Sequence, residues 1–485
     1  MPRLFGLLVV PAVLVLSGCS LGGGDDSTVA DSAPPEAQQG ATAAGSSDDG
    51  RSAVGGFRFP AAPEFSEDEV GEVAPEDVFA SIGTLIAGGL DTDALGRIVD
   101  SNDPRFAWVI ADLLRFSSTA DQQTLLPAAF EQLTGIDASA DPSFAASPWL
   151  SITNHLIAWD LPEPPDYRDY KSRLFTSLES GWEPFFADRD GNLDLRLISW
   201  GGVFIDDRPE GDARPCAGGC IPALDDPPLT DADGGDWYPD DRLVFGVEVG
   251  GEAVAFPRNI MEVHEMVSMT IGGRRLGIPY CTLCGSAQAY FTDEEMVDGN
   301  TLVLRTSGLL SRSNKVMYEL GSKSVFDTFT GEALTGSLRE EGVVLDQATV
   351  VTSTWGEWKE EHPDTKIVAE DGGLGRPYPL DPLGGRDDDG PIFPVGPVDE
   401  RLDVQQQVLG VTTPDGAAVA FPVNEAAAAL AEGETVKEGR VVVTGDSGGL
   451  VAETTDGEPI ASHQAFWFAW SQFHPGTQLW APNGI

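Results

Sequence analysis

Cysteine and histidine are both scarce in this chain of 485 residues, which contains five of each. Thiol and soft-metal chemistry is therefore confined to a few positions. Cys19 stands alone near the N-terminus, and the other cysteines form two close pairs, Cys216 with Cys220 and Cys281 with Cys284. A complete zinc knuckle needs a second C-x-x-C or a histidine pair, and neither occurs.

Several catalytic signatures are also missing. No phosphate-binding loop, dinucleotide fingerprint or Ser/His/Asp order is present. In "HEMVS" Ser268 stands where a metalloprotease helix needs its second histidine, so a metalloprotease is not indicated. The stretch "TGDSGG", Thr444 to Gly449, is similar to a serine-protease nucleophile segment. No histidine and aspartate arrangement of that fold precedes it, and we interpret the stretch as a turn.

Basic residues are few, 29 against 78 acidic ones, which gives a net charge of −49. Such an acidic protein repels phosphate backbones and anionic headgroups, so we expect no nucleic acid partner. Any attachment to a membrane must then come from a lipid.

Long apolar runs are lacking except at the start, where Arg3 precedes an apolar stretch from Leu4 to Leu16. The sequence "LSGC" follows and ends at Cys19, which resembles a bacterial lipoprotein signal. The resemblance implies cleavage before Cys19, lipidation of its thiol and a location on the extracytoplasmic face of the cell membrane. The alternative is an ordinary signal peptide whose cysteine is incidental.

The remaining chain divides by composition. Residues 20–74 are rich in Gly, Ser, Pro and acids, and we expect a disordered tether. Residues 75–190 show helical spacing and predict a helical domain. In "DPRFAWVIADLLRF", one helix face is predicted to be buried, namely Phe106, Val109, Ile110, Leu113 and Leu114.

Residues 191–485 read as mainly β, so the fold class is α+β with an N-terminal helical array. Hairpins are predicted around Gly250-Gly251, Gly272-Gly273 and Gly321-Ser322, with a short helix in "PRNIMEVHEMV". "VFGVEVGGEAVAFPRN" and "VLGVTTPDGAAVAFPVN" are similar, which predicts two related, imperfectly repeated units at about 236–345 and 400–485. We also align "FDTFTGEAL", from Phe326, with "WSQFHPGTQL", from Trp470.

The pair Cys281 and Cys284 is the strongest candidate for chemistry. The two thiolates can face one ion, and His264 lies on the predicted short helix upstream. We predict a zinc or copper site from these three residues. Further ligands could come from His463, His474 or Met261. His155 is interpreted as a core histidine, and His362 as an exposed helix cap.

Two other functions stay open. C-x-x-C is also the motif of thiol–disulfide enzymes and redox sensors. Alternatively the protein is a non-enzymatic module whose helical domain binds a protein partner, with the cysteine pair as a structural staple. The sequence thus leaves open whether this is an enzyme. Cys216 and Cys220 flank Ala-Gly-Gly, and we expect a disulfide between them in an oxidising compartment.

The β region carries an ordered series of motifs: "DRLVFGVEVGGEAVAFPRNIMEVHEMV", "IPYCTLCGSAQAYF", "TSGLLSRSNKVMYE" and "FDTFTGEAL". Together they resemble the bacterial domain-of-unknown-function family 3179, from about Trp200 to the C-terminus. The resemblance implies no settled biochemical activity. The family pattern has a tryptophan before the helix histidine, where this chain has Val263.

Overall fold

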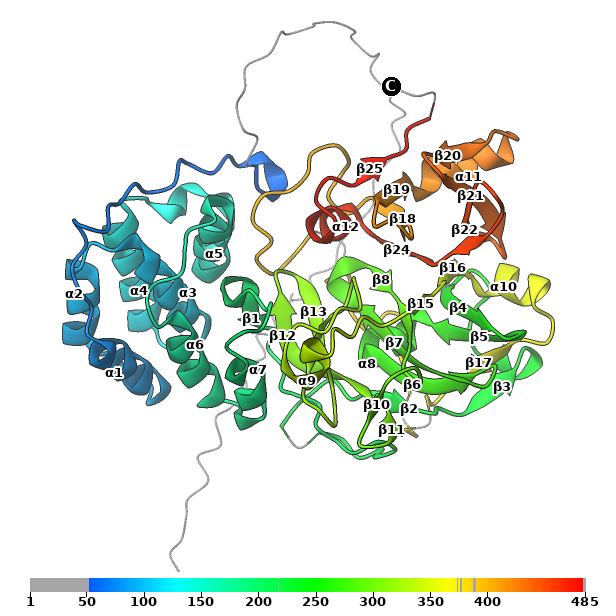
Figure 1. The fold of residues 1–485 in the computed structure, drawn as a ribbon, viewed down its shortest axis with the longest axis horizontal. Coiled ribbons are helices and arrows are strands. Elements are labelled where there is room, and N and C mark those ends of the chain that lie inside the picture. Colours follow the sequence, from blue (N-terminus) through cyan, green and yellow to red (C-terminus); the bar gives the residue numbers. More distant parts are fainter. Residues whose placement is uncertain (1–51, 217, 373, 376, 387–389, 483–485) are drawn as a thin grey trace, which may run out of the picture. The chain divides into compact units, whose positions relative to one another are not determined.

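A computed structural model describes residues 52–482, except 217, 373, 376 and 387–389 (Figure 1). Cys19, the predicted lipobox and residues 20–51 of the predicted tether lie outside the described residues. Across the described part, no helix combines the length and apolar character that a membrane crossing requires.

The helical region follows the sequence signals closely. Thr119 caps α4 together with Gln122 in a reciprocal capping box, and Gly135 ends that helix in the left-handed conformation. All five residues of the predicted apolar face on and just before α3 are buried. The helices are α1 (Pro75–Ile86), α2 (Thr92–Asp100), α3 (Ala107–Arg115), α4 (Ala120–Thr134), α5 (Pro148–Trp159), α6 (Tyr167–Thr176) and α7 (Glu183–Ala187).

Residues 52–74 are part of the folded protein, which corrects the predicted limit of the tether at residue 74. Phe59 is buried and contacts the ring of His155, and the indole of Trp159 donates a hydrogen bond to Pro60. The few apolar residues of this otherwise polar stretch are thus enough to dock it on α5. His155 is fully buried and donates from Nδ1 to Ser151, as predicted for a core histidine.

The β-rich region consists, within the described ranges, of five small sheets arranged like a five-bladed propeller, plus one two-stranded ribbon (Figure 1). The first sheet is β1 (Ile198–Trp200), β12 (Leu304–Ser311), β13 (Asn314–Glu319) and β14 (Val325–Asp327). The second has the order β15 (Gln347–Ala348), β9 (Ala289–Phe291), β7 (Arg274–Cys281), β6 (Met266–Ile271) and β2 (Leu224–Asp225), with β8 (Ser286–Ala287) beside β7.

Three further sheets complete the arrangement. The third sheet is β16 (Val351–Thr354), β4 (Leu243–Val249), β5 (Glu252–Pro257), β17 (Lys366–Val368) and β3 (Leu229–Asp231). The fourth is β24 (Ser462–Phe466), β18 (Gln407–Thr412), β19 (Ala418–Pro422) and β25 (Gln478–Leu479). The fifth is β20 (Val436–Glu438), β21 (Val441–Asp446), β22 (Gly449–Thr454) and β23 (Pro459–Ile460), and the ribbon is β10 (Met296–Val297) with β11 (Asn300–Thr301).

Short helices connect these strands. They are α8 (Arg258–His264), α9 (Gly336–Glu340), α10 (Trp355–Glu361), α11 (Val423–Ala431) and α12 (Trp467–Phe473). The predicted hairpins β4–β5, β6–β7 and β13–β14 are all antiparallel pairs, and α8 is the predicted short helix between the first two. These predictions are therefore confirmed.

The third and fourth sheets share a local design. In each, a hairpin (β4–β5 or β18–β19) has an antiparallel strand on one side and a parallel one on the other. A side chain at Gly246 would collide with the ring of Trp358, and one at Gly410 with the ring of Trp470. Both glycines are thus needed because a tryptophan lies flat on the strand.

The alignment of Phe326 with Trp470 is wrong. Phe326 lies in β14, whereas Trp470 lies in α12 and has its structural counterpart at Trp358 in α10. A histidine ring packs against each tryptophan, His362 at 4.1 Å and His474 at 4.0 Å between ring centroids. The error arose because the inserted segment between β7 and β16 has no counterpart in the fourth sheet. The relation between the full units stays a prediction.

Candidate functional site: a buried dithiol beside a lysine

The cysteine pair lies where a strand ends. Cys281 is the last residue of β7, and Thr282–Cys284 form one 3₁₀ turn. Gly285 follows with φ of +57°, a left-handed conformation that favours glycine. The predicted strand-to-turn geometry is thus present, and it turns both sulfur atoms to one side.

Both thiols are free and buried, with exposed fractions of 2% for Cys281 and 0% for Cys284. The segment that opens β13 covers them. The Cys284 thiol lies 3.5 Å from the carbonyl oxygen of Ser313 and 3.6 Å from Oδ1 of Asn314. The backbone N–H of Lys315 donates to Sγ of Cys281 at 3.4 Å. The Cys281 thiol also lies 3.8 Å from the Ser313 carbonyl oxygen, so both thiols face this acceptor, and Cys281 in addition receives a hydrogen bond from the main chain.

This asymmetry separates the acidities of the two thiols. Burial and the negative charge of Glu265 raise the pKa of Cys281, but the hydrogen bond from the Cys284 thiol, the Lys315 N–H and the Lys315 ammonium together outweigh them. The pKa of Cys281 is therefore lowered. Burial raises the pKa of Cys284 well above its ordinary value, and its hydrogen bond to Cys281 raises it further. The pair thus loses its first proton readily and its second with difficulty, with the thiolate on Cys281.

Lys315 connects the thiols to the end of α8. Its ammonium donates to the carbonyl oxygen of Glu265 and lies 3.3 Å from that residue's Oε2. Burial lowers the pKa of Lys315, and the neighbouring Glu265 and the two thiols oppose that effect. Thr282 donates its hydroxyl to Oε1 of Glu265 at 3.2 Å. A thiolate, an ammonium and a carboxylate are thus held in one chain of contacts.

A cavity of about 260 Å³ adjoins this group. Glu265, Thr282, Leu283 and Lys315 are among the residues that line it, whereas neither cysteine does. The thiols therefore lie directly behind the cavity wall. A small molecule in the cavity would meet the ammonium and the Thr282 hydroxyl before it reached Cys281.

His264 does not form one ligand group with the two cysteines. This differs from the three-residue metal site that the sequence predicted. Its Nδ1 hydrogen-bonds to the carbonyl oxygen of Pro222 and its Nε2 to the hydroxyl of Tyr378, both at 2.6 Å. Both ring nitrogens are thus engaged elsewhere. The residue that reaches toward the thiols from α8 is its neighbour Glu265, through Lys315.

The additional ligands proposed from the sequence have packing roles. Burial lowers the pKa of His463 to about 3 and that of His474 to about 4. His463 contacts the side-chain amide of Gln347 at 2.9 Å, and His474 stacks on Trp470. Met261 is fully buried in the apolar core that β4 to β7 share. These three side chains serve the cores around them.

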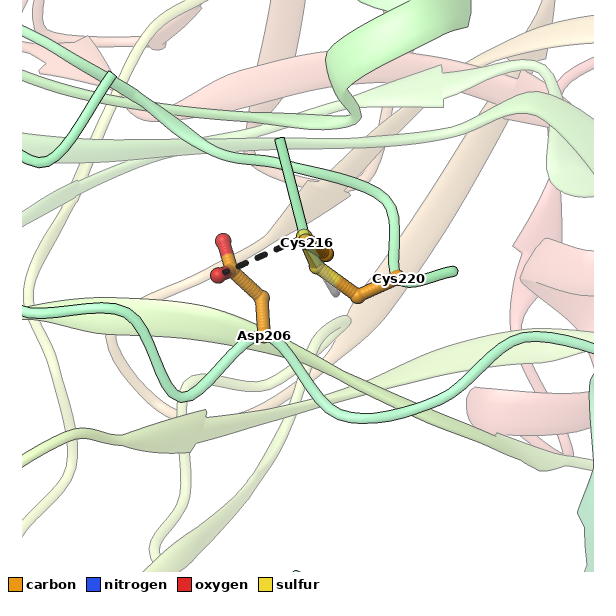
Figure 2. A group of neighbouring side chains, drawn as sticks. All are labelled: Asp206, Cys216 and Cys220. Atoms are coloured by element: carbon orange, nitrogen blue, oxygen red, sulfur yellow. Dashed lines mark hydrogen bonds between the residues drawn. A yellow bond between two sulfur atoms is a disulfide. The ribbon is translucent and has the colours of Figure 1, made fainter. Parts of the chain in front are cut away.

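Cys216 and Cys220 are joined as a disulfide, with Cα atoms 5.4 Å apart (Figure 2). Asp206 lies beside them, and its Oδ1 is 3.9 Å from Sγ of Cys216. These three residues are the group in the described ranges whose ligand atoms lie close enough to hold a metal ion. However, the sulfurs are bonded to each other, and the Asp206 carboxylate accepts from Nε and Nη2 of Arg208 at 2.6 and 2.8 Å. The group therefore does not suit a zinc or copper ion.

Sequence reasoning missed Lys315, Glu265 and Thr282. Lys315 had a usable signal, because it is a charged residue directly before the apolar run "VMY" of a predicted strand, and in the structure it is only 4% exposed. A lysine is almost never buried without a partner, so its position in a β pattern points to a specific contact. Glu265 and Thr282 had no such signal, since polar residues at helix ends and turns are ordinary.

Comparison with known proteins gives a family but no activity. No curated protein and no solved structure matches this chain. Residues 218–457 match a family described as "Protein of unknown function (DUF3179)", a range that contains the dithiol, Lys315 and Glu265. This match over residues 218–457 supports the resemblance to the family DUF3179 that the motifs of the β-rich region indicated.

Proposed function

We propose that this protein is a thiol–disulfide redox protein whose reactive group is the Cys281/Cys284 dithiol. The observation that carries the proposal is the unequal pair itself. The Cys281 sulfur receives hydrogen bonds from the Cys284 thiol and from the Lys315 N–H, with the Lys315 ammonium beside it. A thiolate is the nucleophile of thiol–disulfide exchange, and these contacts stabilise it on Cys281.

The reaction needs only the two cysteines and a disulfide substrate. The Cys281 thiolate attacks one sulfur of a small disulfide, and the other half of the substrate leaves as a thiolate. The Cys284 thiol then loses its proton and attacks Cys281 in the mixed disulfide, which releases the second half. The two cysteines lose two electrons and form a disulfide, and the substrate gains them and becomes two thiols. Lys315 stabilises the negative charge at each stage.

A zinc or copper site remains as the second candidate, now with Cys281 and Cys284 as its only cysteine or histidine ligands. Two thiolates suit a soft ion, and the oxygen atoms of Ser313 and Asn314 lie within 3.6 Å of Cys284. The buried ammonium of Lys315 opposes this function, because it repels a cation and already compensates the thiolate charge.

Trapping of the mixed disulfide tests the redox proposal. Without Cys284 the intermediate on Cys281 cannot resolve, so Cys284→Ser treated with hydroxyethyl disulfide should gain one adduct on Cys281. Cys281→Ser is the matched control and should gain none on Cys284, whose pKa is raised. Equal labelling of the two variants, or no labelling in either, would contradict the proposal. One equivalent of zinc or copper in the untreated protein would favour the metal site.

For location, we propose a lipid anchor at Cys19 on the extracytoplasmic face of the membrane. The lipoprotein-like signal supports it, and a Cys216–Cys220 disulfide suits an oxidising compartment. Cys19→Ala should release the protein from the membrane fraction or leave its precursor unprocessed. Unchanged partitioning with normal processing would rule the anchor out. A protein partner for the helical region is a further proposal, which a pull-down with residues 52–190 deleted would test.

A further inference from the structure

Outside the dithiol site, three side chains from distant parts of the chain lie in one line of contacts, a hydrogen bond followed by a longer ion-pair contact. Ser447 lies in the turn between β21 and β22, and its Oγ is 2.9 Å from Nε2 of His362. His362 caps the end of α10, and its Nδ1 is 3.6 Å from Oε2 of Glu248 in β4. A hydroxyl, an imidazole and a carboxylate thus follow one another as in acyl-transfer enzymes.

The matching histidine of the fourth sheet shows what packing alone requires. The rings of His362 and His474 pack against their tryptophans with the same tilt of 36°, and both residues occupy the C-cap position of a short helix. Yet in the described chain no protein atom hydrogen-bonds to the buried Nε2 of His474. The stacked histidine is therefore explained by the fold, whereas the serine and glutamate partners of His362 are an addition to it.

The backbone at Ser447 is unusual. Its φ is +51°, in the left-handed region that glycine adopts at little cost and serine rarely does. Its carbonyl oxygen accepts a hydrogen bond from the hydroxyl of Ser353, which fixes the turn. Its own hydroxyl also lies 2.9 Å from Oδ1 of Asp446, so its proton has two acceptors. Glycine would adopt this turn at a lower conformational cost. We therefore explain the serine at this position by its hydroxyl, which contacts His362.

A cavity of about 570 Å³ opens beside this turn. Gly448 and Gly449, the two residues after Ser447, form part of its wall. Amide side chains are frequent in the rest of the lining, and Oε1 of one of them, Gln407, is buried without a partner in the described protein. The lining also contains one cation and one anion, Arg258 and Glu357. The cavity thus suits a group without net charge that has hydrogen-bonding atoms, bound beside the turn that carries Ser447.

We propose that Ser447 is a nucleophile activated by His362 and that the protein cleaves an ester whose acyl or alcohol part is neutral and rich in hydrogen-bonding groups. The Ser447 oxygen attacks the ester carbonyl carbon while its proton moves to Nε2 of His362. The ester C–O bond breaks, and His362 returns that proton to the leaving alcohol. Water then cleaves the acyl-serine by the same proton transfers and releases the acid.

A fluorophosphonate probe tests this assignment on the whole folded chain. We expect one adduct, located on Ser447 by peptide mass analysis. Ser447→Gly removes the hydroxyl and suits the left-handed turn, so it should fold and gain no adduct. His362→Ala should label at least about 100-fold more slowly, the usual contribution of a general base. His474→Ala is the matched control, because it removes an equally stacked ring, and its labelling rate should equal that of the wild type.

Glu248 is a positioning residue in this proposal, since it contacts His362 and no substrate. Glu248→Gln should slow labelling, and Glu248→Asp should restore part of the rate. A wild-type chain that gains no adduct, an equal adduct in Ser447→Gly, or equal rates in His362→Ala and His474→Ala would each overturn the proposal. The line of contacts would then be a structural link between α10 and the fifth sheet. None of these outcomes depends on the dithiol.

Discussion

The two cysteine pairs show how surroundings, more than spacing, set the chemistry of a thiol. Cys216 and Cys220 lie in a partly exposed loop, are bonded to each other and sit beside a carboxylate that Arg208 neutralises. Cys281 and Cys284 are buried, remain free and lie beside an ammonium. The arginine that bonds the carboxylate beside the first pair, Arg208, is thus already paired, whereas the Lys315 ammonium lies beside the second pair and lowers the pKa of Cys281. A reactive role therefore belongs to the second pair.

His264 connects the surroundings of the two cysteine pairs, although it forms a metal site with neither of them. Its Nδ1 holds the carbonyl oxygen of Pro222, two residues after Cys220, and Glu265 follows it directly in the chain. The loop of the first pair is thus fixed to the helix end that positions Lys315. This arrangement explains a buried histidine in the place where the sequence suggested a metal ligand.

The largest expected difference between the pairs is in reversible oxidation. In the oxidised wild type, a mild reductant should open the Cys281–Cys284 disulfide and release two free thiols. Cys281→Ser cannot form this disulfide and should release none. Cys216→Ser should leave that response of the Cys281/Cys284 pair unchanged. Counting alkylated thiols by intact mass after graded reduction measures both. A Cys281→Ser chain that still gains two thiols under the mildest reduction would break the distinction.

The second difference concerns stability. Replacing both Cys216 and Cys220 by serine removes a covalent link that closes a very short loop, which should cost about 2 kcal/mol in the free energy of unfolding. The corresponding replacement of Cys281 and Cys284 by serine breaks no covalent bond. We therefore expect a smaller loss in the free energy of unfolding for this double variant. Urea denaturation of the two double variants under non-reducing conditions compares them. A larger loss in the Cys281/Cys284 variant would reverse the assigned roles.

The third prediction concerns Lys315. Lys315→Met keeps the backbone N–H and the length of the side chain but removes the ammonium, so the pKa of Cys281 should rise. Because the folded pKa is the lowered one, the thiolate of the wild type persists to lower pH and is lost as the pH falls through that value. At neutral pH the variant should therefore react several-fold more slowly with methyl methanethiosulfonate. Lys437→Met, at an exposed lysine of β20, is the control and should react as the wild type does.

The smallest effect is expected at the link between the pairs. Tyr378→Phe removes the hydroxyl that bonds Nε2 of His264, which should cost about 1 kcal/mol of unfolding free energy. Metal content should not change, because His264 ligates no metal in this account. A drop in bound zinc or copper in Tyr378→Phe would instead support the three-residue metal site.

The sequence predicted the architecture better than the site, for physical reasons that particular residues make clear. The face of α3, the glycine hairpins and the turn at Gly285 depend on local periodicity and backbone conformation, which neighbouring residues determine. The partners of Cys281 depend on long-range packing. Lys315 lies 34 residues away along the chain and reaches the thiols because β13 covers the end of β7. His264 was close in sequence, but its ring was taken by Pro222 and Tyr378, which no local pattern could show.

The most direct test of the redox assignment is a titration of purified full-length protein in buffers of graded dithiothreitol redox potential, with alkylation and peptide mass analysis of each cysteine. We predict that Cys281 and Cys284 pass together from two alkylated thiols to one disulfide in a single reversible two-electron step, while no zinc or copper accompanies the protein. Cysteines 281 and 284 that stay reduced at every potential, or that bind one metal ion and resist oxidation, would contradict it.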